Sequence, residues 1–231
     1  IDPDTTAELA SFYQKQHQPD KAAAAFQRYV DKATDRVSVS NQCQWLVDYY
    51  VEHGQTDKAL EVAEMAADVY SFRGLETYGR LLEQLHRFPE AETAFKNIAD
   101  RYEDQIPLYL FYRRNPMSGG FGMKAEGMER AIFPAGIKNA ALADFSGPPK
   151  TGVLITEENE LLRGNGLKAG DIIVGFDGRR VDTFDQYAFI RSLSDSPAFH
   201  LVVYQDGKYR DLDVSIPNRR FGVGMETYVP R

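Results

Sequence analysis

The chain has 231 residues, of which 43% are hydrophobic and 26% are charged, and its formal net charge is −7. This length suits one large domain or two ordinary ones, each with its own core. No run approaches the roughly 18 consecutive apolar residues that span a bilayer, which argues against membrane insertion. One cysteine, Cys43, and four scattered histidines argue against a disulfide and a metal site, and we expect no cofactor.

Charge is divided unevenly along the chain. Residues 1–106 carry 11 Lys and Arg against 19 Asp and Glu, whereas residues 107–231 carry 16 against 15. An acidic surface repels phosphate backbones, so nucleic acid is not an expected partner. The first residues, Ile1 to Asp4, include neither Met nor a basic or apolar leader, and we expect a mature or excised piece. The compartment stays open: periplasmic or secreted if a signal peptide was removed, otherwise cytoplasmic.

Three similar segments occur in the first half of the chain. Each has a turn followed by a small residue, at Ala22, Ala59 and Ala91, with spacings of 37 and 32 residues. Four residues later stand Phe26, Ala63 and Phe95. An apolar pattern of helical period precedes each turn. Residues 1–106 are therefore predicted to form three helix-turn-helix units.

These units resemble the tetratricopeptide repeat (TPR), whose length is about 34 residues and whose small residues let paired helices approach closely. Ala10, Val47 and Gly79 match the small position of its first helix. The resemblance implies an all-α solenoid whose concave face binds a second protein. A role as spacer or oligomerisation face is the alternative.

The helical pattern stops at Pro107, and we place a domain boundary near residue 106. Residues 108–114, rich in Tyr and Phe, are predicted to form a strand. The next residues, Ser118-Gly119-Gly120, invite comparison with the nucleophile loop of trypsin-like proteases. A serine nucleophile needs a histidine base and an orienting carboxylate on a suitable scaffold, and the preceding hundred residues are helical repeats. No enzyme activity is expected.

Strand and turn signals dominate the rest of the chain. Gly166, Gly170 and the pairs Asp177-Gly178 and Asp206-Gly207 suit tight turns, and Asp171 can bond backbone amides. One helix is expected, at 183–193. Strands are expected at 151–156, 172–176, 199–204 and 209–216.

This order resembles a PDZ domain, specifically the bacterial type found in HtrA-like proteases, over residues 108–217. The resemblance implies a mainly-β domain at 107–231, a small sandwich or barrel with one or two helices. It also implies a glycine-rich loop whose amides capture a peptide carboxylate, followed by a strand that pairs with the peptide. The loop is matched to Ser118, Gly119, Gly120, Phe121 and Gly122, and the pairing strand to residues 122–126.

The pocket for the last peptide side chain is expected between this loop and the predicted helix. Tyr187 and Ile190 on the helix, with Phe121 and Met123 opposite, would make it apolar and favour an apolar final residue. Residues 127–150 form an insertion that could cap the groove.

The C-terminal segment 218–231 repeats the loop pattern in Phe221-Gly222-Val223-Gly224-Met225. Three roles stay open for it: an extra edge strand, the start of a permuted second module, or a tail that occupies and inhibits the groove.

The sequence as a whole predicts a non-catalytic scaffold. The PDZ-like groove would hold C-terminal or extended peptides, and the TPR-like surface would hold a second protein, with no nucleic acid and no direct membrane insertion. The alternative is the regulatory, substrate-recognition portion of a larger HtrA-like serine protease, with its catalytic domain elsewhere.

Overall fold

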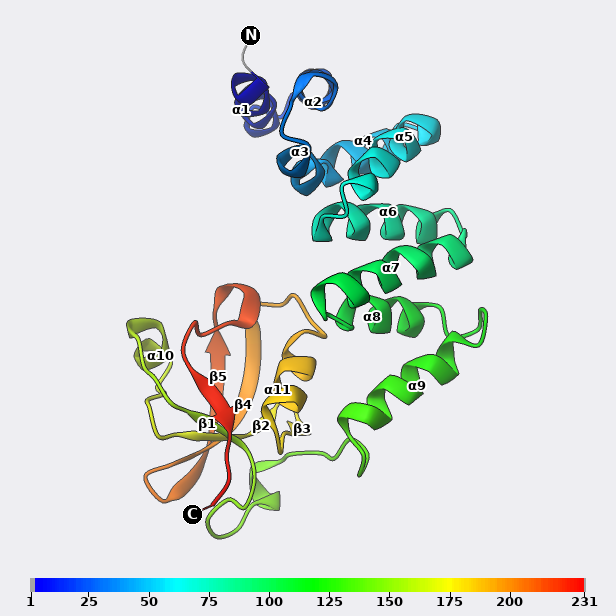
Figure 1. Cartoon of the computed structure of the whole chain (residues 1–231). Helices are drawn as coiled ribbons and strands as arrows, with labels where there is room; N and C mark the ends of the chain where they lie inside the picture. Colours follow the sequence, from blue (N-terminus) through cyan, green and yellow to red (C-terminus); the bar gives the residue numbers. More distant parts are fainter. Residues whose placement is uncertain (1–2, 231) are drawn as a thin grey trace. The chain divides into compact units, whose positions relative to one another are not determined.

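The computed structural model describes residues 3–230 and divides into two compact units, with the division along the chain between Gly122 and Met123 (Figure 1). The first unit is helical and the second contains an antiparallel sheet. Each unit is described by itself below.

The first unit is an array of helical hairpins. Helix α1 packs against α2, α4 against α5, and α6 against α7, which confirms the predicted helix-turn-helix units. Neighbouring hairpins pack through α2 and α4 and through α5 and α6. The helices are α1 (Pro3–Lys15), α2 (Pro19–Lys32), α3 (Arg36–Gln42), α4 (Gln44–Glu52), α5 (Thr56–Asp68), α6 (Phe72–Gln84), α7 (Phe88–Tyr102) and α8 (Ile106–Arg114).

Small residues stand where paired helices approach most closely. Ala22, Ala59 and Ala91 are fully buried, as the repeat pattern predicts. At Gly79 a β-carbon would lie 3.0 Å from the ring of Phe95, so only glycine fits there without a shift of that ring.

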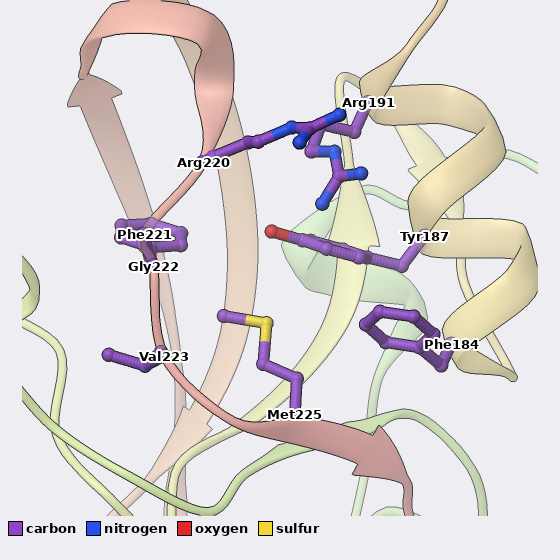
Figure 2. A pocket seen from close by; sticks show the side chains of 8 residues that line it. All are labelled: Phe184, Tyr187, Arg191, Arg220, Phe221, Gly222, Val223 and Met225. Atoms are coloured by element: carbon purple, nitrogen blue, oxygen red, sulfur yellow. The ribbon is translucent and has the colours of Figure 1, made fainter.

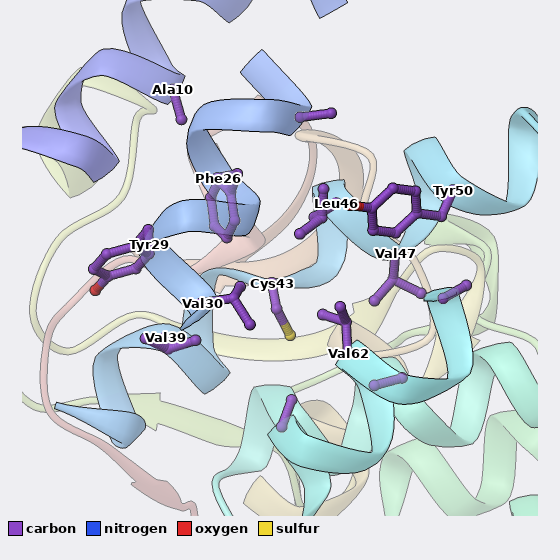
Figure 3. Close-up of a cluster of buried hydrophobic side chains, with 14 of the residues drawn as sticks. Ala10, Phe26, Tyr29, Val30, Val39, Cys43, Leu46, Val47, Tyr50 and Val62 are labelled. Carbon is purple, nitrogen blue, oxygen red and sulfur yellow. The ribbon is translucent and has the colours of Figure 1, made fainter. Parts of the chain in front are cut away.

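Helices α2, α4 and α5 share an apolar cluster with residues of α1, α3 and α6 (Figure 3). Cys43 lies inside this cluster, and burial raises the pKa of its thiol to about 11. The thiol is therefore neutral at ordinary pH and fills core space, as predicted from its helical surroundings.

The strand predicted at residues 108–114 is wrong: this segment lies in helix α8. Pro107 stands at the start of the helix, where its missing N–H costs nothing. Leu108, Phe111 and Tyr112 are buried on one face, and the ring of Phe111 lies 5.2 Å from that of Phe95. The aromatic residues that suggested a strand close the end of the helical array, so the first unit extends past the boundary expected near residue 106.

The second unit holds one sheet in which the strand order is β5-β4-β2-β1-β6 and every pairing is antiparallel; β3 pairs with β2. Its strands are β1 (Val153–Ile155), β2 (Ile172–Phe176), β3 (Arg179–Arg180), β4 (Ala198–Gln205), β5 (Lys208–Ser215) and β6 (Met225–Thr227). Its helices are α9 (Phe121–Ile132), α10 (Glu160–Gly164) and α11 (Phe184–Arg191), with short 3₁₀ turns at Leu142–Asp144 and Pro217–Arg219.

The turns of this unit have the conformations that the sequence predicts. Asp177 and Gly178 have φ values of 47° and 71°, and the pair at 206–207 likewise has two positive values. Asp171 accepts a hydrogen bond from the backbone N–H of Lys168 at 2.9 Å. These turns set the register of the strands on either side.

The expected insertion at 127–150 divides into two parts. Residues 127–132 continue helix α9, and the loop that follows returns to the sheet, where Asn139 bridges to Arg179. The ring of Phe133 packs against Phe189 of α11 at 5.9 Å between centroids. This loop supports α11 and β3.

Substituting Gly74 by alanine should destabilise the helical unit. A β-carbon there would lie 2.2 Å from the carbonyl oxygen of Ala66 and 2.3 Å from the hydroxyl of Ser40, which a well-packed interface cannot accept without moving α6 from α5. We expect a loss of about 1–3 kcal/mol of unfolding free energy, measured by urea titration with circular dichroism. Gly127→Ala is the control, because no atom lies within 4 Å of its β-carbon position and alanine favours a helix by up to about 1 kcal/mol. Equal stability of the two variants would contradict the close approach.

Candidate functional site

A groove lies between helix α11 and the segment that leads into β6 (Figure 2). Its volume is about 360 Å³, within the roughly 300–1,000 Å³ typical of ligand sites. Three lining residues come from α11 and five from the C-terminal segment. They are Phe184, Tyr187 and Arg191, and Arg220, Phe221, Gly222, Val223 and Met225.

Strand β6 is at one edge of the sheet. It pairs with β1, and the N–H of Thr156 donates to Gly224 at 3.0 Å while that of Tyr228 donates to Gly152 at 2.9 Å. Backbone groups alternate in direction along an antiparallel strand, so those of Met225 and Thr227 point away from β1. Within the described part of the chain no strand pairs with this outer edge, which is open to another strand.

The loop before β6 presents unbonded amides. Those of Phe221, Gly222 and Val223 donate to no residue within the range 3–230, whereas the N–H of Gly224 donates to the carboxylate of Glu157 at 3.1 Å. Gly222 has φ 67°, a left-handed conformation that glycine adopts without strain. Successive N–H groups in such a turn form a concavity suited to an anion.

Arg219 fixes the position of this loop. Its side chain is 2% exposed, pairs with the carboxylate of Asp177, and lies over the rings of Phe176 and Phe199 at 4.9 and 5.2 Å. One further donor of the guanidinium reaches the carbonyl of Ser194 at 3.4 Å. A buried charge is tolerated only when paired in this way, so the loop is held to the β2–β3 turn.

Helix α11 forms the other wall and is fixed at its first turn. Thr183 caps the helix by accepting from the N–H of Gln186, whose side chain bonds the carbonyl of Ile132 at 3.0 Å. The N–H of Phe184 donates to the hydroxyl of Thr227 at 3.0 Å, which ties the start of α11 to β6. The width of the groove is thus set by hydrogen bonds on both walls.

Tyr187 forms the floor of the groove between the two walls. Its ring packs edge-on against Phe176 at 5.3 Å, and its side chain is 1% exposed. Burial raises the pKa of this phenol, although the neighbouring charge of Arg191 opposes the shift. The hydroxyl therefore stays protonated.

The predicted site residues fall in different places. Tyr187 lines the groove between α11 and the C-terminal segment. Ile190 is buried in the core and does not line it. Met123 is 73% exposed on α9, and Phe121 is buried against Phe111 and Tyr112 at 5.0 and 5.2 Å. Neither therefore forms the apolar wall that was expected opposite α11.

The predicted carboxylate loop is a helix-to-helix turn. Ser118, Gly119 and Gly120 connect α8 to α9, and the amides of Ser118, Phe121 and Gly122 already donate to carbonyls within that turn. The strand predicted at 122–126 is wrong, because these residues belong to α9. Its Met, Lys, Ala and Glu residues favour a helix, and this propensity decides the structure.

The loop that does carry free amides was detectable only as the second copy of the pattern, at Phe221 to Met225. The extra edge strand expected in segment 218–231 is β6. Residues 220–223 and 225 line one wall of the groove and therefore do not occupy it. The insertion 127–150 contributes no residue to the described lining and therefore does not form the wall of the groove.

Two smaller hollows lie among the described residues of the helical unit. One, of about 280 Å³, lies between α5, α6 and α7 and is lined in part by Tyr70, Tyr78 and Asn97. The other, of about 40 Å³, lies between α4 and α6 beside Asp48 and Arg80. Burial raises the pKa of Asp48, and Glu52 adds to the shift while Arg80 opposes it.

Residues 3–230 include no helix that is both long and apolar enough to cross a bilayer. Across the same residues, no three His, Cys, Asp or Glu side chains are grouped so as to hold a metal ion.

No protein-family model matches the chain, and no curated protein matches it. Among solved structures, MamA AMB-1 is 23% identical, covering 56% of this chain and 74% of that one, with a TM-score of 0.41. The first TPR of Spaghetti (RPAP3), bound to an HSP90 peptide, is 13% identical over 57% and 95%, with a TM-score of 0.36. The Sgt2 TPR domain from Aspergillus fumigatus is 17% identical over 64% and 85%, with a TM-score of 0.35. All three TM-scores are below 0.5, so the helical hairpins are identified from the packing of their own helices.

Two adjacent arginines should differ sharply in their effect on stability. Arg219→Ala removes the buried partner of Asp177 and leaves a void beside two aromatic rings, so we expect a loss of about 2–4 kcal/mol in thermal unfolding. Arg220→Ala, at an exposed position, should change stability by less than about 0.5 kcal/mol. Equal melting temperatures for the two variants would show that Arg219 does not anchor the loop.

Proposed function

We propose that the second unit is a PDZ-like domain, of the type found in bacterial HtrA-like proteases, that binds the C-terminal tail of a partner protein. The tail lies as an added strand along β6, opposite α11. The chain acts as a non-catalytic scaffold, and the helical unit binds a second protein.

The free amides of Phe221, Gly222 and Val223 at the end of an open strand edge support this proposal most strongly. A terminal carboxylate can accept from several N–H groups at once, and such charge-assisted bonds are stronger than bonds between neutral groups. The peptide backbone then pairs with the outward groups of Met225 and Thr227. The carboxylate loop proposed here thus replaces the one expected at 118–122.

For the helical unit, the hollow between α5, α6 and α7 is the best candidate contact surface, because Tyr70 and Tyr78 line it and tyrosine is enriched at protein interfaces. Two modest sites on one chain gain affinity through effective concentration when both partners belong to one assembly. The resemblance to HtrA-like proteins keeps one alternative: the chain is the substrate-recognition part of a larger serine protease.

Carboxylate capture is tested with a random library of C-terminal peptides, each made as free acid and as amide, against the whole chain. We expect free acids to bind at least about tenfold more tightly, the equivalent of about 1.4 kcal/mol, by fluorescence anisotropy. Equal binding of acids and amides would reject the function proposed for the groove.

The loop itself is tested with a matched pair of glycines. Gly222 and Gly207 both have positive φ and open space at the β-carbon position, but only Gly222 lines the groove. Alanine at either site costs a similar strain of about 1 kcal/mol. Gly222→Ala should weaken free-acid binding about tenfold, and Gly207→Ala should leave it unchanged; parallel losses would assign the effect to strain alone.

A further inference from the structure

Two arginines from opposite walls meet at one end of the groove. Arg191 is the last residue of α11 and Arg220 precedes the loop, and Figure 2 shows their guanidinium groups pointing toward one another beside the hydroxyl end of Tyr187. The side chain of Arg191 also lies over the ring of Tyr187 at 5.7 Å. Two like charges that line one cavity repel, and an anion between them relieves the repulsion.

Neither arginine is neutralised by the described residues of the chain. Arg163, Arg180 and Arg219 each pair with a nearby carboxylate, but in the range 3–230 no Asp or Glu pairs with Arg191 or Arg220. No acidic residue is found among the eight that line the groove. This end of the cavity therefore carries two positive charges without a counter-charge.

The loop amides and the two guanidinium groups can serve different anions. The amides of Phe221 to Val223 are sufficient for the terminal carboxylate of a tail, which leaves the arginines available for a second one. The side chain of the last peptide residue enters the same cavity, where the half-buried Val223 and Met225 offer apolar surface to its methylene groups. A guanidinium pairs with a carboxylate through two parallel hydrogen bonds, which favours this second anion.

We infer that the groove selects tails whose last residue is glutamate or aspartate, with Arg191 and Arg220 as the residues that determine this specificity. The inference rests on the proposed function and specifies its ligand. It replaces the apolar final residue expected from Tyr187 and Ile190, because Ile190 is in the core and the rim is cationic.

The test uses three peptide pools, randomised upstream and fixed at the last residue as Glu, Gln or Leu, each as free acid and amide. Gln matches Glu in shape and lacks only the charge. We expect the Glu free-acid pool to bind the full chain at least about tenfold more tightly than the Gln and Leu pools, by fluorescence anisotropy. If Leu or Gln free acids bind as tightly as Glu, the inference is wrong while the proposed function stands. If no pool distinguishes acid from amide, both are wrong.

Variants assign the effect to the arginines. Arg191→Gln and Arg220→Gln should each reduce the Glu-to-Gln affinity ratio by about threefold or more, and the double variant should bring it near one. Arg210→Gln, on the exposed part of β5, changes net charge equally and should leave the ratio unchanged. Unaltered melting temperatures show that the variants are folded. A ratio that survives the double variant, or falls equally with Arg210→Gln, overturns the assignment.

Discussion

The pairing of β6 with β1 is the constraint on which the groove depends. Three residue pairs, from Val153 with Thr227 to Ile155 with Met225, bring the C-terminal segment to the sheet edge. A strand this short is not stable by itself. Hydrogen bonds hold the strand at both ends. After the strand, the N–H of Tyr228 donates to the carbonyl of Gly152, and before it, the side-chain amide of Asn159 donates to the carbonyl of Phe221. The same segment supplies the open edge and the loop amides, so losing the pairing would remove both.

Arg219 determines where the chain enters that strand. A hydrophobic side chain of similar size would pack against Phe176 and Phe199 with less desolvation, and buried ion pairs are often no more stable than such replacements. The charge of Arg219 fixes the position of its side chain more narrowly than apolar packing would, because the Asp177 carboxylate accepts a directional bond at one place only. That carboxylate also accepts from the N–H of His200, so one side chain links the loop, the β2–β3 turn and β4.

The sequence predicted most of the fold because its strongest signals are local. The turn at Asp177-Gly178 and the small residues Ala22, Ala59 and Ala91 each constrain their immediate surroundings and are found as expected. The strand predicted at 108–114 is wrong because a short aromatic run fits a buried helix as well as a strand. The strand predicted at 122–126 is wrong because its residues favour a helix. Of the site residues named from the sequence, only Tyr187 lines the groove. The glycine-rich loop pattern occurs twice in the chain. The second copy differs from the first because the strand beside it, β6, pairs with β1, some seventy residues earlier. No local sequence pattern specifies such a distant pairing.

The charge distribution of this chain favours recognition of an acidic tail by direct contact over recognition by long-range electrostatic attraction. The net charge is −7, and residues 1–106 hold 19 acidic against 11 basic side chains, so the overall field does not draw an acidic tail inward. At physiological ionic strength that field is screened beyond about 8 Å. The two guanidinium groups act on the last residue within hydrogen-bonding distance, which is well inside the screening length. An acidic residue far from the tail's end would thus gain little, while one at the end meets Arg191 and Arg220 directly, and this difference in distance is what makes the last residue decisive.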